Sequence, residues 1–406
     1  MGNGLPAVAP FARMSRVHAL MTVGETTMAI ALADSLFLSI SPDAARTKVI
    51  LFLAVSIAPF AVVSPLVGPA IDRMRGGHRA VVMLVGALRA VVLVAMAWNL
   101  DSLRLFPLAF AALILGKTYA IAKSAIVPSI VKDESQLVAS NSKLGQVAGI
   151  TGFVMAIPAA TLQLISSQAT LMLGALAYVV AALNAYRLPK MVSVNGGNRQ
   201  LEDEELHSPV VVNAANAMRV LRGIVGFMFF HLAFWLRGED AGTAWFGFAV
   251  AMSGLATLAA NFVGPYLRDK MRESTMLMAS LIAIAIAGIA ATWYDRVVGG
   301  IALAAVINAS AAIGRLAFES TVQSGAPDAN RGRAFARFET QNQMAWVLGG
   351  LIPVALSPSG AVGFAIVAIV GVIGAVNYVR TNNGATPNRS TRSRGERATN
   401  RAHPPR

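Results

Sequence analysis

The stretch AVVMLVGALRAVVLVAMAWN, residues 80–99, contains one charged residue, Arg89, in twenty positions. Wound as an α-helix, it is long enough to cross the roughly 30 Å of hydrocarbon in a bilayer. The chain contains twelve such apolar blocks, near 17–40, 49–68, 80–99, 106–127, 144–165, 168–187, 220–237, 242–264, 274–294, 297–319, 340–356 and 360–379. They are too long, and too uniformly apolar, for the alternating strands of a membrane barrel. The sequence therefore predicts an all-α polytopic membrane protein with twelve transmembrane helices.

The composition agrees with this prediction and argues against several classes of function. Hydrophobic residues make up 55% of the 406 positions and charged residues 13%, about half the charged share of a soluble protein. The absence of cysteine excludes disulfides, thiolate metal sites and cysteine nucleophiles. The chain has no Walker A, HExxH or GxSxG motif. We expect a protein that is not an enzyme and that uses no metal and no cofactor.

The basic residues of the loops predict the orientation. Of the 34 Lys and Arg, 25 fall on the side that holds both termini and five on the other side. Basic loops stay on the cytoplasmic side, so we expect a protein of the cell membrane with both termini in the cytoplasm. This bias also accounts for the net charge of +14 without a nucleic-acid partner. Membrane lipids are the expected neighbours of the basic loops, and we expect a monomer.

The longest internal connection is polar and divides the chain. The predicted domains are an N-terminal six-helix half (1–187), a cytoplasmic linker (188–219), a C-terminal six-helix half (220–379) and a basic, disordered cytoplasmic tail (380–406). The two halves resemble each other weakly. Gly68-Pro69 follows the second span and Gly264-Pro265 follows the eighth, 196 positions later. Lys123 and Arg315, in spans four and ten, are 192 positions apart. These matches predict a 6+6 pseudo-symmetric duplication.

The loop after the second span carries the resemblance to a known family. It contains Gly68, Asp72, Arg73 and Arg79, in a pattern like Gly-x-x-x-Asp-Arg-x-x-x-x-x-Arg. With twelve spans and a central loop, the chain resembles the major facilitator superfamily of transporters. The stretch 128–152 is similar to drug-exporter-like members, which include macrolide and siderophore exporters. The resemblance implies that the loop is a cytoplasmic latch for the outward-facing state; the alternative is an ordinary basic loop.

Charged residues inside the spans are the candidates for function, because each costs about 2.5–3.5 kcal/mol at mid-membrane on insertion scales. Six of the seven lie in spans one, four and ten, and His231 lies in span seven. In the resembled family, spans one, four, seven and ten line the central cavity. The seven residues are Glu25, Asp34, Arg89, Lys117, Lys123, Arg315 and Glu319.

Two of these charges are candidates for proton coupling. Glu25 and Asp34 are nine residues apart, on opposite faces of one helix, so they cannot share a site. Either could carry a proton; the alternative is a structural ion pair with Lys117 or Lys123.

The other charged groups also have alternative roles. Arg315 and Glu319 are spaced to pair along one helix face, either as cavity groups or as a pair reaching toward the membrane surface. Arg89 could reach an acid of a neighbouring helix, and His231 could be a packing residue.

These observations favour a secondary active transporter that works by alternating access. The leading expectation is proton-coupled efflux of a small amphipathic compound by an antiporter, with the compound and protons as its partners. One alternative is uptake or facilitated transport of a polar or anionic solute. The other is a membrane scaffold or sensor that has the transporter fold and transports nothing.

Overall fold

The computed structural model describes residues 10–37, 77–100, 102, 104–131, 136–189, 206–236, 242–325 and 331–384. Within these residues the regular structure is helical. In chain order the helices are α1 (Pro10–Phe37), α4 (Gly77–Ala97), α5 (Leu105–Ile130), α6 (Leu137–Ile165), α7 (Ser167–Ala185), α9 (Pro209–Trp235), α10 (Gly242–Lys270), α11 (Glu273–Tyr294), α12 (Val297–Gly325), α13 (Arg331–Leu356) and α14 (Gly360–Gly384).

These helices coincide with eleven of the twelve predicted spans. The remaining span, 49–68, lies outside the described residues, so the full number of twelve stays a prediction. By length and composition, nine of the described helices could cross a membrane. The other two, α1 and α13, are 28 and 26 residues long and contain more polar residues. The chain is a multi-pass membrane protein.

Several helices begin earlier than the apolar blocks suggest. Helix α9 begins at Pro209 rather than near 220, and α13 begins at Arg331 rather than near 340. Proline suits the first turn of a helix because the amide hydrogen that it lacks has no partner there. Hydropathy detects only the length that hydrocarbon covers, whereas backbone hydrogen bonds continue through polar residues.

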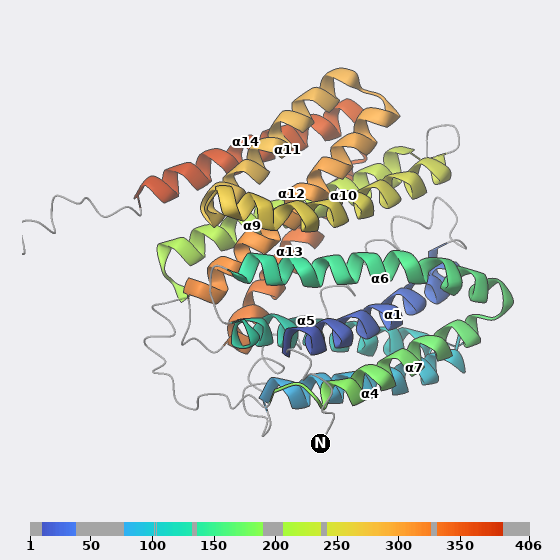
Figure 1. Ribbon diagram of the computed structural model, residues 1–406. Coiled ribbons are helices and arrows are strands. Elements are labelled where there is room, and N and C mark those ends of the chain that lie inside the picture. The colour runs from blue at the N-terminus through green and yellow to red at the C-terminus, as the bar shows by residue number, and fades with distance from the viewer. Residues whose placement is uncertain are drawn as a thin grey trace, which may run out of the picture.

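The helices form two groups that pack side by side (Figure 1). The first group contains α1 and α4–α7, and the second contains α9–α14. Helix α6 packs against α10 and α12, and α5 packs against α13, so these helices form the boundary between the groups. The predicted domain limits, with a linker at 188–219, stay a prediction. We call the end of the bundle at which α1 begins and α14 ends, on the left in Figure 1, the terminal end.

Helices α9 and α13 touch backbone to backbone. A side chain at Gly226 would overlap the Trp346 carbonyl, and one at Gly349 would overlap the Gly223 carbonyl. Only glycine allows this approach. Because no flexible side chain separates the two backbones, we expect α9 and α13 to move as one pair.

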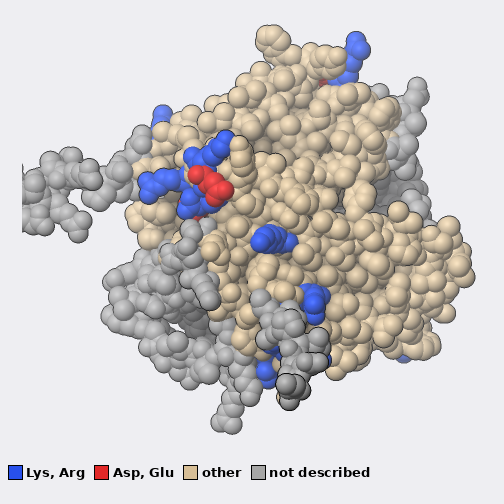
Figure 2. All heavy atoms as spheres, in the orientation of Figure 1, with Lys and Arg blue, Asp and Glu red and all other residues tan. Residues whose placement is uncertain are grey.

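The outer surface is suited to lipid. In the view of Figure 2 most of the surface is uncharged, and a mixed group of basic and acidic side chains lies at the left, toward the terminal end. Large apolar side chains point outward, such as Ile157, Leu164 and Leu183, which are 73%, 89% and 68% exposed. Such a surface would be unfavourable in water and is the expected one in hydrocarbon.

Candidate functional site

A cavity of about 710 Å³ lies between the two groups of helices. Residues of α1, α5 and α6 form one wall, and residues of α9, α10 and α12 form the other. Its volume falls in the range of small-molecule binding sites. Four of the predicted charged residues line this cavity: Glu25, Lys123, Arg315 and Glu319.

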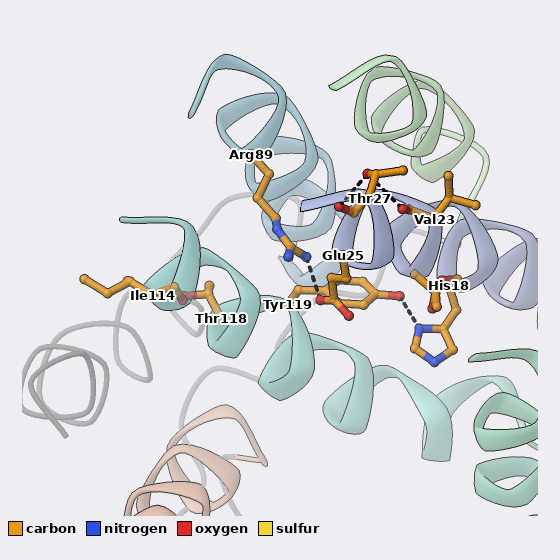
Figure 3. A network of polar contacts seen from close by, with 10 residues as sticks. His18, Val23, Glu25, Thr27, Arg89, Ile114, Thr118 and Tyr119 are labelled. Atoms are coloured by element: carbon orange, nitrogen blue, oxygen red, sulfur yellow. Dashed lines mark hydrogen bonds and ion pairs between the residues drawn. The ribbon is translucent and has the colours of Figure 1, made fainter. Parts of the chain in front are cut away.

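On the side of the first group, the cavity meets an ion pair between α1 and α4. Arg89 donates a hydrogen bond from Nη1 to Glu25 Oε1 at 2.8 Å (Figure 3). The Arg89 side chain is only 2% exposed, whereas that of Glu25 is 46% exposed. The guanidinium carbon lies 4.3 Å from the centre of the Tyr178 ring. Glu25 and the ring therefore compensate the buried cation, and the first group presents an acid to the cavity.

A second polar contact lies nearer the terminal end on the same wall. His18 Nδ1 lies 3.0 Å from the Tyr119 hydroxyl, joining α1 to α5 (Figure 3). His18, Thr22 and Glu25 all line the cavity. Their spacing of four and three residues places them along one face of α1. The first wall is thus a polar stripe that ends at the Glu25 carboxylate.

On the side of the second group, the cavity meets an ion pair within α12. Arg315 Nε donates to Glu319 Oε1 at 2.8 Å. Here the arginine side chain is 47% exposed and the acid 8%. The second group therefore presents a cation to the cavity. The predicted pairing along one helix face is present.

A smaller cavity of about 90 Å³ adjoins the main one at Arg222, Arg315 and Glu319. Beside it, Lys117 Nζ lies 3.0 Å from Glu339 Oε1. Since Lys117 belongs to α5 and Glu339 to α13, this ion pair joins the two groups. The side chains are 29% and 25% exposed, respectively.

Two cations on the cavity have no carboxylate within ion-pair distance. Among the described residues, no acidic oxygen lies within 4.0 Å of Lys123 or Arg222. Both residues line the main cavity, together with the exposed Arg315. The described charges around the two cavities are five cations and three acids, and each acid is paired. The site thus has a surplus of two positive charges: Arg89, Lys117, Lys123, Arg222 and Arg315 against Glu25, Glu319 and Glu339.

Amide side chains join the two groups near the terminal end. Asn141 Nδ2 donates to Gln323 Oε1 at 2.9 Å, and Gln323 Nε2 donates to the Ser124 carbonyl at 3.0 Å. Gln146 Nε2 donates to the Asn261 carbonyl at 2.8 Å. Between described residues of the two groups, the hydrogen bonds and ion pairs all lie from mid-helix toward this end. The two groups are therefore joined by hydrogen bonds on the terminal-end side of the cavity.

Other predicted site residues lie away from the cavity. Arg89 lies behind Glu25 and does not line it. His231 is 1% exposed, packs against the rings of Phe227, Trp235 and Phe364, and lines none of the three cavities. The backbone of Asp34 belongs to α1, and its side chain lies outside what the structure describes. In the described part of the chain, no three His, Asp or Glu side chains gather as metal ligands would.

Of the predicted latch, only Arg79 falls within the described residues; Gly68, Asp72 and Arg73 lie outside them. Arg79 Nη1 donates to the Tyr186 carbonyl at 3.1 Å, just after α7. Its guanidinium carbon lies 5.0 Å from the centre of the Tyr186 ring. A cation suits the carbonyl groups at the end of a helix. Arg79 thus ties the beginning of α4 to the end of α7.

Sequence reasoning missed two charged residues of the site, Arg222 and Glu339. Both lie at the edge of an apolar block: Arg222 is the third residue of the block 220–237, and Glu339 directly precedes the block 340–356. In the structure both are inside helices, because α9 and α13 begin earlier than predicted. Their only sequence signal is helical periodicity that continues across the polar segment before each apolar block.

Comparison with known sequences gives relatives without a described function. No family model matches the chain. An uncharacterized protein of Mycobacterium leprae (strain TN) is 28% identical over 397 residues, which cover 87% of this chain and 68% of that protein. An uncharacterized protein of Mycobacterium tuberculosis (strain ATCC 25618 / H37Rv) is 28% identical over 392 residues, covering 86% of this chain and 70% of that protein.

Comparison with solved structures gives the fold. A bacterial homologue of the iron transporter ferroportin, in an outward-facing state, superposes with a TM-score of 0.73 at 14% identity, covering 92% of this chain and 99% of that one. The major facilitator superfamily transporter FucP, in the outward conformation, gives 0.70 at 12% identity and covers 92% and 99%. The human organic anion transporter MFSD10 gives 0.63 at 16% identity and covers 92% and 100%. The chain has the fold of major facilitator superfamily transporters.

Proposed function

We propose that this protein is a secondary active transporter that works by alternating access. The observation that carries the proposal is the charged cavity between two helix groups that are fastened together on one side of it. Breaking the terminal-end bonds and closing the other side would expose the cavity to the opposite face of the membrane. The likeness to transporter structures supports this reading.

The arrangement corresponds to an outward-facing state when the loop charges are taken into account. The positive-inside bias puts the terminal end in the cytoplasm. The bonds from Asn141 to Gln323 and from Gln146 to Asn261 then close the cytoplasmic side. Two of the structural neighbours are described as outward-facing as well.

Proton coupling through Glu25 extends this proposal. At 46% exposed, its carboxylate is the most exposed acid among the described residues that line the cavity, so water in the cavity can exchange protons with it. Protonation removes the attraction between Glu25 and Arg89, while the Tyr178 ring still holds the guanidinium. A site that binds a proton from outside and releases it inside could drive an antiporter, in which inward proton movement is exchanged for outward movement of a small compound. Asp34, on the opposite face of α1, is the second candidate for this role.

A substrate-blind flux assay tests the transporter proposal. The full chain is reconstituted in liposomes with an internal pH-sensitive dye, and pooled organic anions, lipophilic cations, macrolides and sugars are added. We expect solute-dependent proton flux with one class. Absence of flux with every pool would reject the proposal as stated and favour the scaffold or sensor.

A covalent cross-link between the two groups tests alternating access. Because the chain contains no cysteine, only the introduced cysteines can react with the reagent. In the variant Asn141→Cys with Gln323→Cys, a short bis-thiol reagent should bridge the two groups and stop flux; a cleavable reagent should restore it. The control pair is Gln163→Cys with Ser167→Cys, whose natural side chains lie 2.6 Å apart within the first group. Flux that survives the first bridge would contradict alternating access.

Replacing the acid tests coupling. Glu25→Gln alone leaves Arg89 buried without an anion, so the informative variant is Glu25→Gln with Arg89→Met, which removes both charges. We expect this pair variant to lose proton flux while keeping its fold, and Asp34→Asn to retain proton flux. The reverse result would assign coupling to Asp34.

A further inference from the structure

Proton coupling leaves two features of the site without a role: the surplus of positive charge and an apolar cavity beside it. We propose that the site binds an organic anion with an apolar body. Its acid group would lie on Lys123 and Arg222, and its body against the aromatic side chains of α9, α10 and α13. This inference names the substrate class of the proposed transporter and so rests on the proposed function.

The charges of the site favour an anion over a cation. Each of the three described acids of the site already has a basic partner at 2.8–3.0 Å, so a cationic solute would find no unpaired carboxylate among them. Among the described residues, Lys123 and Arg222 have no acid within ion-pair distance. Both are repelled by Arg315, while the more distant Glu319 attracts Lys123 and Glu339 attracts Arg222. In a low-dielectric wall this repulsion is relieved when an anion binds among the three cations.

The shape of the anion follows from the neighbouring cavity. A cavity of about 240 Å³ is lined by Phe229, Phe246 and Trp346. It shares Val225, Gly254, Thr257 and Asn308 with the main cavity, so the two cavities adjoin. One end of the combined space is therefore cationic and the other aromatic. A ligand that uses both must be amphipathic.

Helix α9 sets the spacing between the two ends. Arg222, Val225 and Phe229 follow one another at three and four residues, and therefore lie along one stripe of the helix. Seven residues of α-helix span about 10 Å. The favoured ligand thus has its acid group and the far side of its apolar body separated by about this distance, the length of a phenyl ring on a short alkyl chain.

A binding series tests the proposal without requiring transport. The purified full chain in nanodiscs is titrated calorimetrically with phenylalkanoates from phenylacetate to 8-phenyloctanoate, each alongside its carboxamide. We expect every acid of sufficient length to bind at least about tenfold more tightly than its amide, since a charge-assisted contact is lost in the amide. Affinity should rise with chain length until the ring reaches Phe229.

Matched variants locate the effect. Arg222→Gln and Lys123→Gln should each weaken binding of the acids about tenfold and leave the amides unchanged, and Arg222→Lys should restore part of the loss. Arg219→Gln is the control on the same helix, because Arg219 bonds to Asn216 and lines no cavity. Lys143→Gln, on the exposed face of α6, is the control for Lys123. Phe229→Ala should weaken the long acids and their amides alike.

The outcomes separate this inference from the transporter proposal. Equal binding of acids and amides, no binding of any acid, or an equal effect of Arg219→Gln and Arg222→Gln would overturn it. If the liposomes then still show flux with a cationic or neutral pool, the transporter proposal stands and the anion inference fails. If acids bind with the expected pattern while no pool gives flux, the anion site stands and the transport proposal fails.

Discussion

The two helix groups each bring one ion pair to the cavity, and these pairs are buried in opposite ways. In the first group the arginine is hidden, 2% exposed, and its acid Glu25 is 46% exposed. In the second group the arginine is 47% exposed and its acid Glu319 is 8% exposed. Both pairs have the same separation of 2.8 Å. The two ion pairs therefore expose opposite charges to the cavity.

The difference shows which member of each pair is structural. A buried ion is stable only while its partner remains, whereas an exposed ion can be solvated when its partner is lost. Arg89 and Glu319 are the members that depend on their partners. Glu25 and Arg315 are the members that a solute or a proton can reach. This assignment predicts how mutations of the two pairs will differ.

The largest effect is expected from Glu25→Gln, which leaves the Arg89 guanidinium buried without an anion. We expect a loss of about 3 kcal/mol in the free energy of unfolding, measured by denaturant titration in detergent with intrinsic tryptophan fluorescence. Arg89→Met, which leaves an exposed acid, should cost about 1 kcal/mol. Adding Arg89→Met to Glu25→Gln should recover stability. Equal losses in the two single variants would contradict the assignment.

In the second group the order should be inverted. Arg315→Gln leaves Glu319 buried, and we expect a loss of about 2 kcal/mol. Glu319→Gln leaves an arginine that the cavity already solvates, so the loss should stay below about 1 kcal/mol. The same titrations compare the two variants. A larger loss in Glu319→Gln would show that the two walls do not differ in this way.

A smaller effect than those of Glu25→Gln and Arg315→Gln is expected at the ion pair that joins the two groups. Lys117→Gln removes a partly exposed ion pair between α5 and α13, which should favour opening at the terminal end by about 1 kcal/mol. The readout is the labelling rate of Ser124→Cys, a buried position beside Gln323, with a water-soluble maleimide. We expect about a fivefold faster reaction. Lys143→Gln is the control, and an unchanged rate with Lys117→Gln would show that this pair does not restrain opening.

Much of the fold could be predicted from the apolar blocks, because hydrocarbon requires about twenty apolar residues for each crossing. The positions at which helices begin could not. Helix α13 begins at Arg331 and includes Arg333, Arg337 and Glu339 before its apolar block. Nothing in hydropathy distinguishes such a helical extension from a loop. Charges at the edges of blocks are therefore systematically assigned to loops.

The charged members of the site were recognisable because each is costly in a span, and Glu25, Lys123, Arg315 and Glu319 do line the cavity. Their partners were less predictable. An ion pair of Glu25 with Lys117 or Lys123 was one alternative from the sequence, yet Glu25 pairs with Arg89 and Lys117 with Glu339. Periodicity gives the face of one helix, whereas the pairing of faces depends on tertiary packing. The Arg315–Glu319 pair was predictable because it lies within one helix.

The direct backbone contact between α9 and α13 has a consequence for how signals pass through the molecule. Gly226 and Gly349 bring the two backbones into direct contact, so we expect Arg222 on α9 and Glu339 on α13 to move together. Binding of a solute at Arg222 and breakage of the ion pair between Lys117 and Glu339 are then thermodynamically linked. If a bound solute changes the opening equilibrium by some factor, opening must change the affinity for that solute by the same factor. Through this backbone contact, solute binding at Arg222 and opening at the Lys117–Glu339 ion pair would influence each other.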